Sequence, residues 1–97
     1  MIDRIRKNEE RLDSINTNLK NVENALEEFK LNKKKIDLLN KYYGSVNWFK
    51  DKEAYEGNKI QKIKAGVLSE DAVWNMNDNI KEIILKMQSI VEEYMKK

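Results

Sequence analysis

The stretch LDSINTNLKNVENALEEF, residues 12–29, decides the fold class. Every seventh residue from its first position, and every seventh from its fourth, is apolar: Leu12, Leu19 and Leu26 in one series, Ile15, Val22 and Phe29 in the other. Two such series three residues apart occupy the a and d positions of a heptad repeat, on one face of an α-helix. This stripe predicts a long amphipathic helix over residues 3–41.

A second stripe near the C-terminus predicts another long helix, over residues 70–95. Its members again follow heptad spacing: Val73, Met76, Ile80, Ile83, Met87, Ile90 and Tyr94. Ser69 precedes this stripe, and serine is a preferred N-cap residue. Glu70 and Asp71 follow the serine, and acidic side chains favour the positive end of a helix dipole.

The chain between the two stripes contains all three glycines, and the sequence has no proline. Gly44 predicts the end of the first helix and Ser45 the cap of a short helix from Val46 to about Tyr55. A turn at residues 56–58 follows, then a possible helical turn over residues 59–65, with Gly66 as its stop. We therefore expect one all-α domain with segments 1–43, 44–69 and 70–97.

The expected architecture is two long antiparallel amphipathic helices, a coiled-coil-like hairpin joined by a short-helix and turn insertion. The helices differ in length, about 39 residues against about 26. The C-terminal helix can therefore cover only part of the first, which leaves the apolar face near Ile5 and Leu12 bare. Because an amphipathic helix gains most of its stability from packing, we expect a homodimer or a higher oligomeric bundle.

Composition excludes several classes of function. The sequence has no cysteine and no histidine, so it offers no disulfide, no thiolate, no imidazole base and no typical transition-metal site. The carboxylates of the middle segment show no spacing diagnostic of an acid/base pair. We accordingly expect no enzymatic activity, no cofactor and no metal. No apolar run is long enough to cross a membrane, so a cytoplasmic location is expected.

Positive charge is concentrated in the middle of the chain. Residues 30–64 hold ten basic and four acidic groups, a net of +6, whereas each flanking part has a net charge of −2. Six of the eight aromatic residues lie between Tyr42 and Asn75. Rings stack on bases and ammonium groups neutralise phosphates, so this combination is what a site for nucleotides or nucleic acid needs. A long duplex partner is not expected, because the chain has acidic ends and a net charge of only +2.

Candidate ligand-binding residues follow from that chemistry. Stacking on a base is assigned to Tyr42, Tyr43 and Trp48, and phosphate contact to Lys50, Lys59, Lys62 and Lys64. Asn47 or Asp51 would hydrogen-bond a ribose or a base edge. The competing interpretation is structural: Trp48, Phe49 and Trp74 form a core where three helices meet, and the lysines are a solvated surface. The sequence leaves both interpretations open.

Two motifs resemble a known family: YYGS with a tryptophan three residues later (Tyr42–Trp48), and GVLSEDA (Gly66–Ala72). The family comprises short bacterial and phage proteins described only as a domain of unknown function, and they too begin with a long charged helix. This chain departs at Asn58, where the family has glycine, and at Gln61, where it has proline. The resemblance supplies no activity, but it implies that the middle segment is the signature of the family. Because the family occurs in phages, the resemblance also suggests a counter-defence role.

Two functions are therefore open. The first is a non-enzymatic protein that sequesters a small anionic nucleotide-type ligand in a basic aromatic pocket. The alternative is a helical module that binds a host or phage protein through its apolar stripes.

Overall fold

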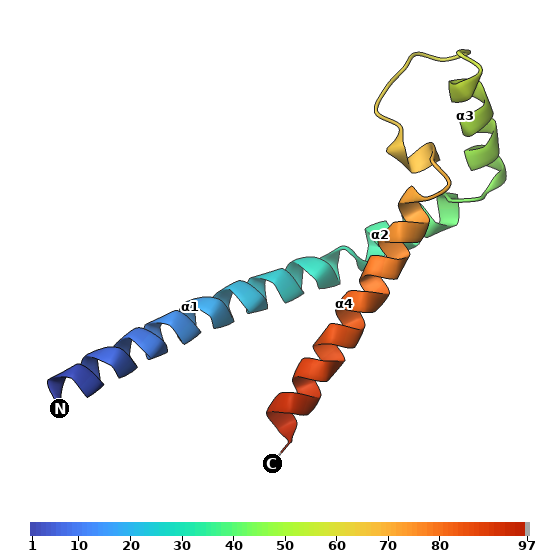
Figure 1. Ribbon diagram of the computed structural model, residues 1–97. Helices are drawn as coiled ribbons and strands as arrows, with labels where there is room; N and C mark the ends of the chain where they lie inside the picture. The colour runs from blue at the N-terminus through green and yellow to red at the C-terminus, as the bar shows by residue number, and fades with distance from the viewer. Residues whose placement is uncertain (97) are drawn as a thin grey trace. The chain divides into compact units, whose positions relative to one another are not determined.

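A computed structural model describes residues 1–96, and all its regular elements are helices (Figure 1). The predicted all-α class is confirmed. The elements, in chain order, are the α-helices α1 (Ile2–Leu31), α2 (Lys33–Tyr42) and α3 (Val46–Glu56), the 3-10 helix η1 (Gly66–Leu68) and the α-helix α4 (Ala72–Met95). The chain forms two compact units, and the boundary falls inside α2, between Asp37 and Leu38.

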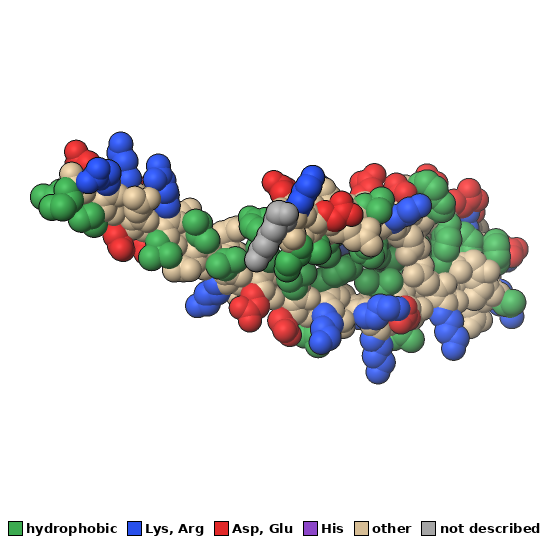
Figure 2. Space-filling view, turned by 90° about the horizontal axis from the view of Figure 1, so that it is seen from below, with side chains coloured by type: hydrophobic (Ala, Val, Ile, Leu, Met, Phe, Trp, Pro, Cys, Tyr) green, Lys and Arg blue, Asp and Glu red, His purple; other side chains and the backbone are tan. Residues whose placement is uncertain are grey.

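The first unit consists of α1 and the first turn of α2. None of the residues of α1 is buried. The apolar a and d positions from Ile5 to Leu26 are exposed, with Leu12 at 51% and Leu19 at 58%, and Phe29 is half-buried. Hydrophobic side chains are accordingly open to view on the N-terminal part of the surface, beside charged ones (Figure 2). The stripe of α1 therefore has no covering layer within its own unit.

The predicted single helix over residues 3–41 is divided in two at Asn32. The Asn32 N–H is shared between the carbonyls of Glu28 and Phe29, at 3.1 and 3.2 Å, and its ψ of −8° departs from the helical value. Asparagine is a poor helix former, because its short amide side chain competes for backbone hydrogen bonds. Heptad periodicity did not reveal the break, since Asn32 lies off the stripe.

The core of the second unit is small and is centred on Trp48, which is 4% exposed. The other two buried apolar residues are Leu68 and Val73. The three come from α3, η1 and α4, and η1 contacts both α3 and α4. A short 3-10 helix between two longer helices thus supplies the layer against which the tryptophan packs.

The end of α2 lies against the start of α4 through a reciprocal amide pair. The Asn40 Nδ2 donates to Asn77 Oδ1 at 3.1 Å, and the Asn77 Nδ2 donates back to Asn40 Oδ1 at 2.7 Å. Tyr43, further along the chain than Asn40, donates to the carbonyl of Glu70, which precedes Asn77. The two segments therefore run antiparallel in this unit, as the hairpin prediction requires.

Caps and turns around α3 follow the sequence prediction. Gly44 has a φ of +74°, the left-handed conformation that glycine adopts without a steric cost. The Ser45 hydroxyl then accepts from the Trp48 N–H at 3.2 Å and so caps α3. Asn58 has a φ of +58° in the turn after α3. The Ser69 hydroxyl accepts from the Ala72 N–H at 3.1 Å, although the N-cap position of α4 is taken by Asp71 and not by Ser69.

The segment after α3 differs from the prediction. Residues 59–65 form no helical turn, and Gly66 begins η1 where we expected it to end a helix. The two isoleucines of KIQKIKA, Ile60 and Ile63, both remain exposed, so the segment has no buried isoleucine face that would stabilise a helix. The last helix begins at Ala72, two residues later than predicted.

No helix among residues 1–96 combines the length and the apolar character that crossing a bilayer requires.

Candidate ligand-binding segment

Tyr42 and Asp51 are brought together across the turn between α2 and α3. The Tyr42 hydroxyl donates to Asp51 Oδ2 at 2.6 Å. This hydrogen bond, reinforced by desolvation and by the negative charge of Asp51, raises the pKa of Tyr42 above its usual 10.0. Of the candidate residues, these two form a polar pair that is accessible to solvent.

Trp48 has a structural role that excludes base stacking. Its ring is buried, and its Nε1–H donates to the Val67 carbonyl at 2.9 Å. Tyr43 and Phe49 contact it edge to face, with ring centroids 5.2 and 4.9 Å away. The core interpretation therefore holds for Trp48. It fails for Trp74 and Phe49, which are 62% and 60% exposed.

Tyr43 is half-buried and held at both ends. Its ring packs on Trp48 at an interplanar angle of 71°, and its hydroxyl donates to the backbone carbonyl of Glu70. A ring fixed in this way supports the junction of α2, α3 and α4, and it is not available for stacking on a base without breaking these contacts. Of the three predicted stacking rings, Tyr42 alone remains a candidate for that role.

Lys52 is a residue that sequence reasoning missed. Its Nζ lies 3.2 Å from Glu70 Oε1 and 3.8 Å from Glu56 Oε1, and 5.4 Å from the centroid of the Trp48 ring. Its side chain is only 21% exposed. Lys52 thus links α3 to the start of α4 above the buried ring. The i, i+4 spacing to Glu56 was the only sequence signal for it.

The predicted phosphate contacts are all solvent-accessible. Lys50 lies on α3, and Lys59, Lys62 and Lys64 lie in the segment that follows; Asn47 is exposed in the first turn of α3. Among residues 1–96, none of these four lysines takes part in an ion pair, whereas Lys33 and Lys52 do. Their charges are therefore not neutralised by neighbouring carboxylates.

The segment of residues 57–65, here called the basic loop, contains three of those lysines. Its start is fixed by the Lys59 N–H, which donates to the Ala54 carbonyl at 2.9 Å. Tyr55 holds the other end: its hydroxyl donates to the Ile63 carbonyl at 2.9 Å. The Lys62 ammonium lies 4.0 Å from the centroid of the Tyr55 ring and also donates to the Tyr55 carbonyl. The basic loop is thus irregular but anchored to α3.

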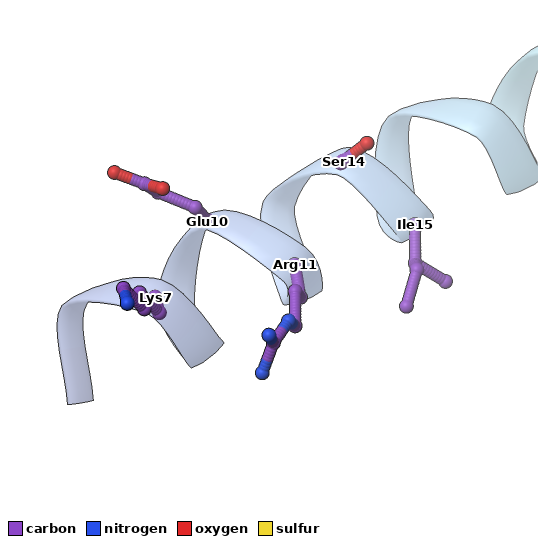
Figure 3. A pocket seen from close by; sticks show the side chains of 5 residues that line it. All are labelled: Lys7, Glu10, Arg11, Ser14 and Ile15. Atoms are coloured by element: carbon purple, nitrogen blue, oxygen red, sulfur yellow. The ribbon is translucent and has the colours of Figure 1, made fainter. Parts of the chain in front are cut away.

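Surface depressions occur on both long helices. One is lined by Lys7, Glu10, Arg11, Ser14 and Ile15, all on consecutive turns of α1. Figure 3 shows Glu10 and Ser14 pointing to the opposite side of the helix from Arg11 and Ile15, so the side chains diverge and enclose no cavity. Another depression lies on α4, lined by Ile84, Met87, Gln88, Val91 and Glu92. Both are shallow features of single helices.

In the part of the chain that the structure describes, no three potential metal ligands cluster together. The site residues instead offer exposed ammonium groups, one accessible phenol and two exposed rings. Ammonium groups attract anions, and exposed rings can contact a planar group.

Comparison with known protein families gives one match, to the domain of unknown function DUF4298, over residues 5–90. The chain belongs to this family. The match covers most of the chain, including both motifs that carried the resemblance, so the expected family is confirmed. Comparison with curated proteins and with solved structures finds no match.

The structure shows what the two motifs do in this DUF4298 member. The first supplies Gly44 and Ser45, which end α2 and cap α3, and the buried Trp48. The second supplies the carbonyl of Val67, which accepts from Trp48, and the buried Leu68. Both motifs thus meet at the core of the second unit. The whole basic loop lies between them and belongs to neither.

Proposed function

We propose that this protein is a non-enzymatic, cytoplasmic binding protein that self-associates and holds a small anionic, nucleotide-type ligand on the basic surface of its middle segment. The observation that carries the proposal is the exposure of Lys50, Lys59, Lys62 and Lys64 without ion-pair partners in a segment of net charge +6. Unneutralised ammonium groups close in the sequence favour a multiply charged anion.

Stacking on the base of the ligand would come from aromatic rings that are accessible to solvent. Tyr42 is half-buried, and its neighbour Asp51 can accept from a ribose hydroxyl or a base edge in addition to the Tyr42 phenol. Phe49 and Trp74 are exposed on α3 and α4 and are the other available rings. Asn47, exposed in the first turn of α3, adds an amide donor and acceptor.

The absence of histidine and cysteine supports binding over catalysis, because both common side chains for proton transfer and nucleophilic attack near neutral pH are missing. The process we propose is phage counter-defence: a small, abundant binding protein that sequesters the nucleotide signal of a host immune pathway. This step rests on the resemblance to phage proteins.

Isothermal calorimetry of the whole chain against cyclic nucleotides and ADP-ribose-type nucleotides tests the proposal. We expect heat with one class, and its loss when Lys59, Lys62 and Lys64 are all changed to glutamine. The matched control changes Lys20, Lys81 and Lys86, three exposed lysines on α1 and α4, and should leave the binding heat intact. A folded chain that gives no heat with any member of the panel would refute ligand binding.

The second candidate function is a protein-interaction module, and a specific observation favours it. Four large apolar residues on α4 are 42–58% exposed: Ile83, Ile84, Ile90 and Val91. Two of them line the depression on α4. If this surface binds a host or phage protein, Val91→Asp abolishes its capture, and the three lysine changes in the basic loop leave capture unaffected.

A further inference from the structure

The stripe of α1 is a complete heptad surface with nothing over it in its own unit. Six of its apolar residues are 46–58% exposed: Ile5, Leu12, Ile15, Leu19, Val22 and Leu26. Leu31, next to the break at Asn32, is 75% exposed. A 30-residue helix with no buried residue gains little stability alone in water, so a partner must cover the stripe.

Helix α4 has too few residues to be that partner along the whole stripe. α4 has 24 residues and α1 has 30, so α4 cannot pair with every turn of α1. The Asn40–Asn77 pair already holds the start of α4 against the end of α2, within the second unit.

A second copy of α1 in parallel, in-register alignment matches the polar position of the stripe. Asn8 occupies a d position between Ile5 and Leu12. If two copies of α1 run parallel and in register, Asn8 lies opposite Asn8 of the other copy. If they run antiparallel with Ile5 opposite Phe29, Asn8 lies opposite Leu26. Its amide already bonds to the Arg4 carbonyl and to Arg11 Nη1, and it keeps one donor and one acceptor position for a second amide. Buried asparagines of this kind set register in coiled coils.

The charges beside the stripe favour the same alignment. The g position Arg4 of one copy lies next to the e position Glu9 of its parallel neighbour, and the later g and e positions place no like charges together. The antiparallel alignment instead brings Glu9 close to Glu23 of the other copy. Like-charge neighbours of this kind are destabilising, so electrostatics disfavours it.

The residue types at a and d indicate the number of copies. The a positions after Ile5 are all leucine, and the d positions Ile15 and Val22 are β-branched. Leucine at a with isoleucine at d shifts parallel coiled coils from two strands towards three or four. A core of four helices also covers a wider face than a dimer seam does.

We propose that α1 forms a parallel, in-register, four-stranded coiled coil over residues 5–29 with three further copies of this chain, with the Asn8 side chains in one layer. The inference rests on the self-association included in the proposed function and specifies its surface, direction and order. It requires nothing of the basic loop, so it does not depend on ligand binding.

Single cysteines test the direction, because the natural sequence contains none. Asn8→Cys and Leu26→Cys each place a thiol on the stripe, and Asn24→Cys places one at an f position on the opposite face. Mild oxidation should convert the Asn8→Cys and Leu26→Cys chains, each alone, from monomer to disulfide-linked pairs on a denaturing gel. Asn24→Cys should stay largely monomeric. Light scattering of the unaltered chain should give about four times its mass of 11.6 kDa.

Each part of the proposal, namely the direction, the interface and the number of strands, has its own contradicting result. Mixing Asn8→Cys with a tagged Leu26→Cys chain and obtaining mainly mixed disulfides would show an antiparallel assembly. An assembled chain whose Asn8→Cys and Leu26→Cys forms cross-link no better than Asn24→Cys would overturn α1 as the interface while leaving self-association standing. A monomeric mass at micromolar concentration would overturn both, and a dimeric mass would overturn the four-stranded order.

Discussion

At the residue scale, Trp48 carries the stability of the second unit. It is the largest of the three buried side chains, and its Nε1–H satisfies the Val67 carbonyl. We expect Trp48→Ala to lower the free energy of unfolding by about 3–5 kcal/mol, the usual cost of removing a buried large aromatic side chain. Urea denaturation followed by circular dichroism measures the change. Trp74→Ala is the control: this ring is 62% exposed, and a loss comparable to that of Trp48→Ala would contradict the assignment.

The Tyr42–Asp51 pair makes a prediction about pH. Because the folded chain raises the pKa of Tyr42 above 10.0, the pair stabilises the fold below pH 10.0. That contribution disappears as pH rises through the folded-state pKa. Asp51→Asn removes the charge and the strong acceptor, so the pKa of Tyr42 should fall toward 10.0. Ultraviolet titration of tyrosinate measures it, with Tyr42→Phe identifying the transition that belongs to Tyr42.

The roles of single residues could be predicted from the sequence only where they do not depend on tertiary contacts. The sequence marked Tyr42, Trp48 and Asp51 as important but could not assign them, because burial of one aromatic among six depends on how η1 packs on α3. Lys52 had no distinctive local pattern, and its partner Glu70 lies 18 residues away in the sequence. Residue type predicted which chemistry is present, and tertiary contact decided which side chains remain free to use it.

At the scale of elements, Gly44 is the position where backbone conformation matters most. Its φ of +74° is one that an L side chain adopts only at a cost of about 1–2 kcal/mol. Gly44→Ala should therefore lower the free energy of unfolding by about that amount, measured by thermal or urea denaturation. Gly66→Ala is a matched control, since Gly66 has no positive φ and a Cβ there meets nothing within 4 Å. Equal losses in both variants would contradict the argument.

The ends of the helices were easier to predict from the sequence than the irregular segments were. Gly44 and Ser45 act through local geometry, so their turn and cap roles were predictable. The break at Asn32 and the irregular basic loop were not predictable, because both concern residues without a stripe to follow. The polar Asn40, an apparent defect in the first stripe, is explained by a residue 37 positions away, its amide partner Asn77.

At the scale of the whole molecule, helix content should depend on concentration. The 30 residues of α1 have no buried residue to stabilise them, so dilution below the assembly constant should reduce the helical circular dichroism signal. Leu19→Lys should produce the same loss at all concentrations, because it places a charge in the centre of the stripe. Asn24→Lys, on the opposite face, should retain the signal. A concentration-independent signal in the unaltered chain would argue against assembly.

Trp48 is buried and the lysine side chains of the basic loop are exposed, and this difference has an evolutionary consequence. Trp48 and Leu68, two of the buried residues of the second unit, lie in the two motifs, whereas Lys59 and Lys64 have exposed side chains outside them. Substitutions at exposed positions of this kind cost little stability. Sequence changes at Lys59 and Lys64 are therefore compatible with a folded second unit. Asn58 and Gln61, where the resemblance leads us to expect glycine and proline, both lie within that loop.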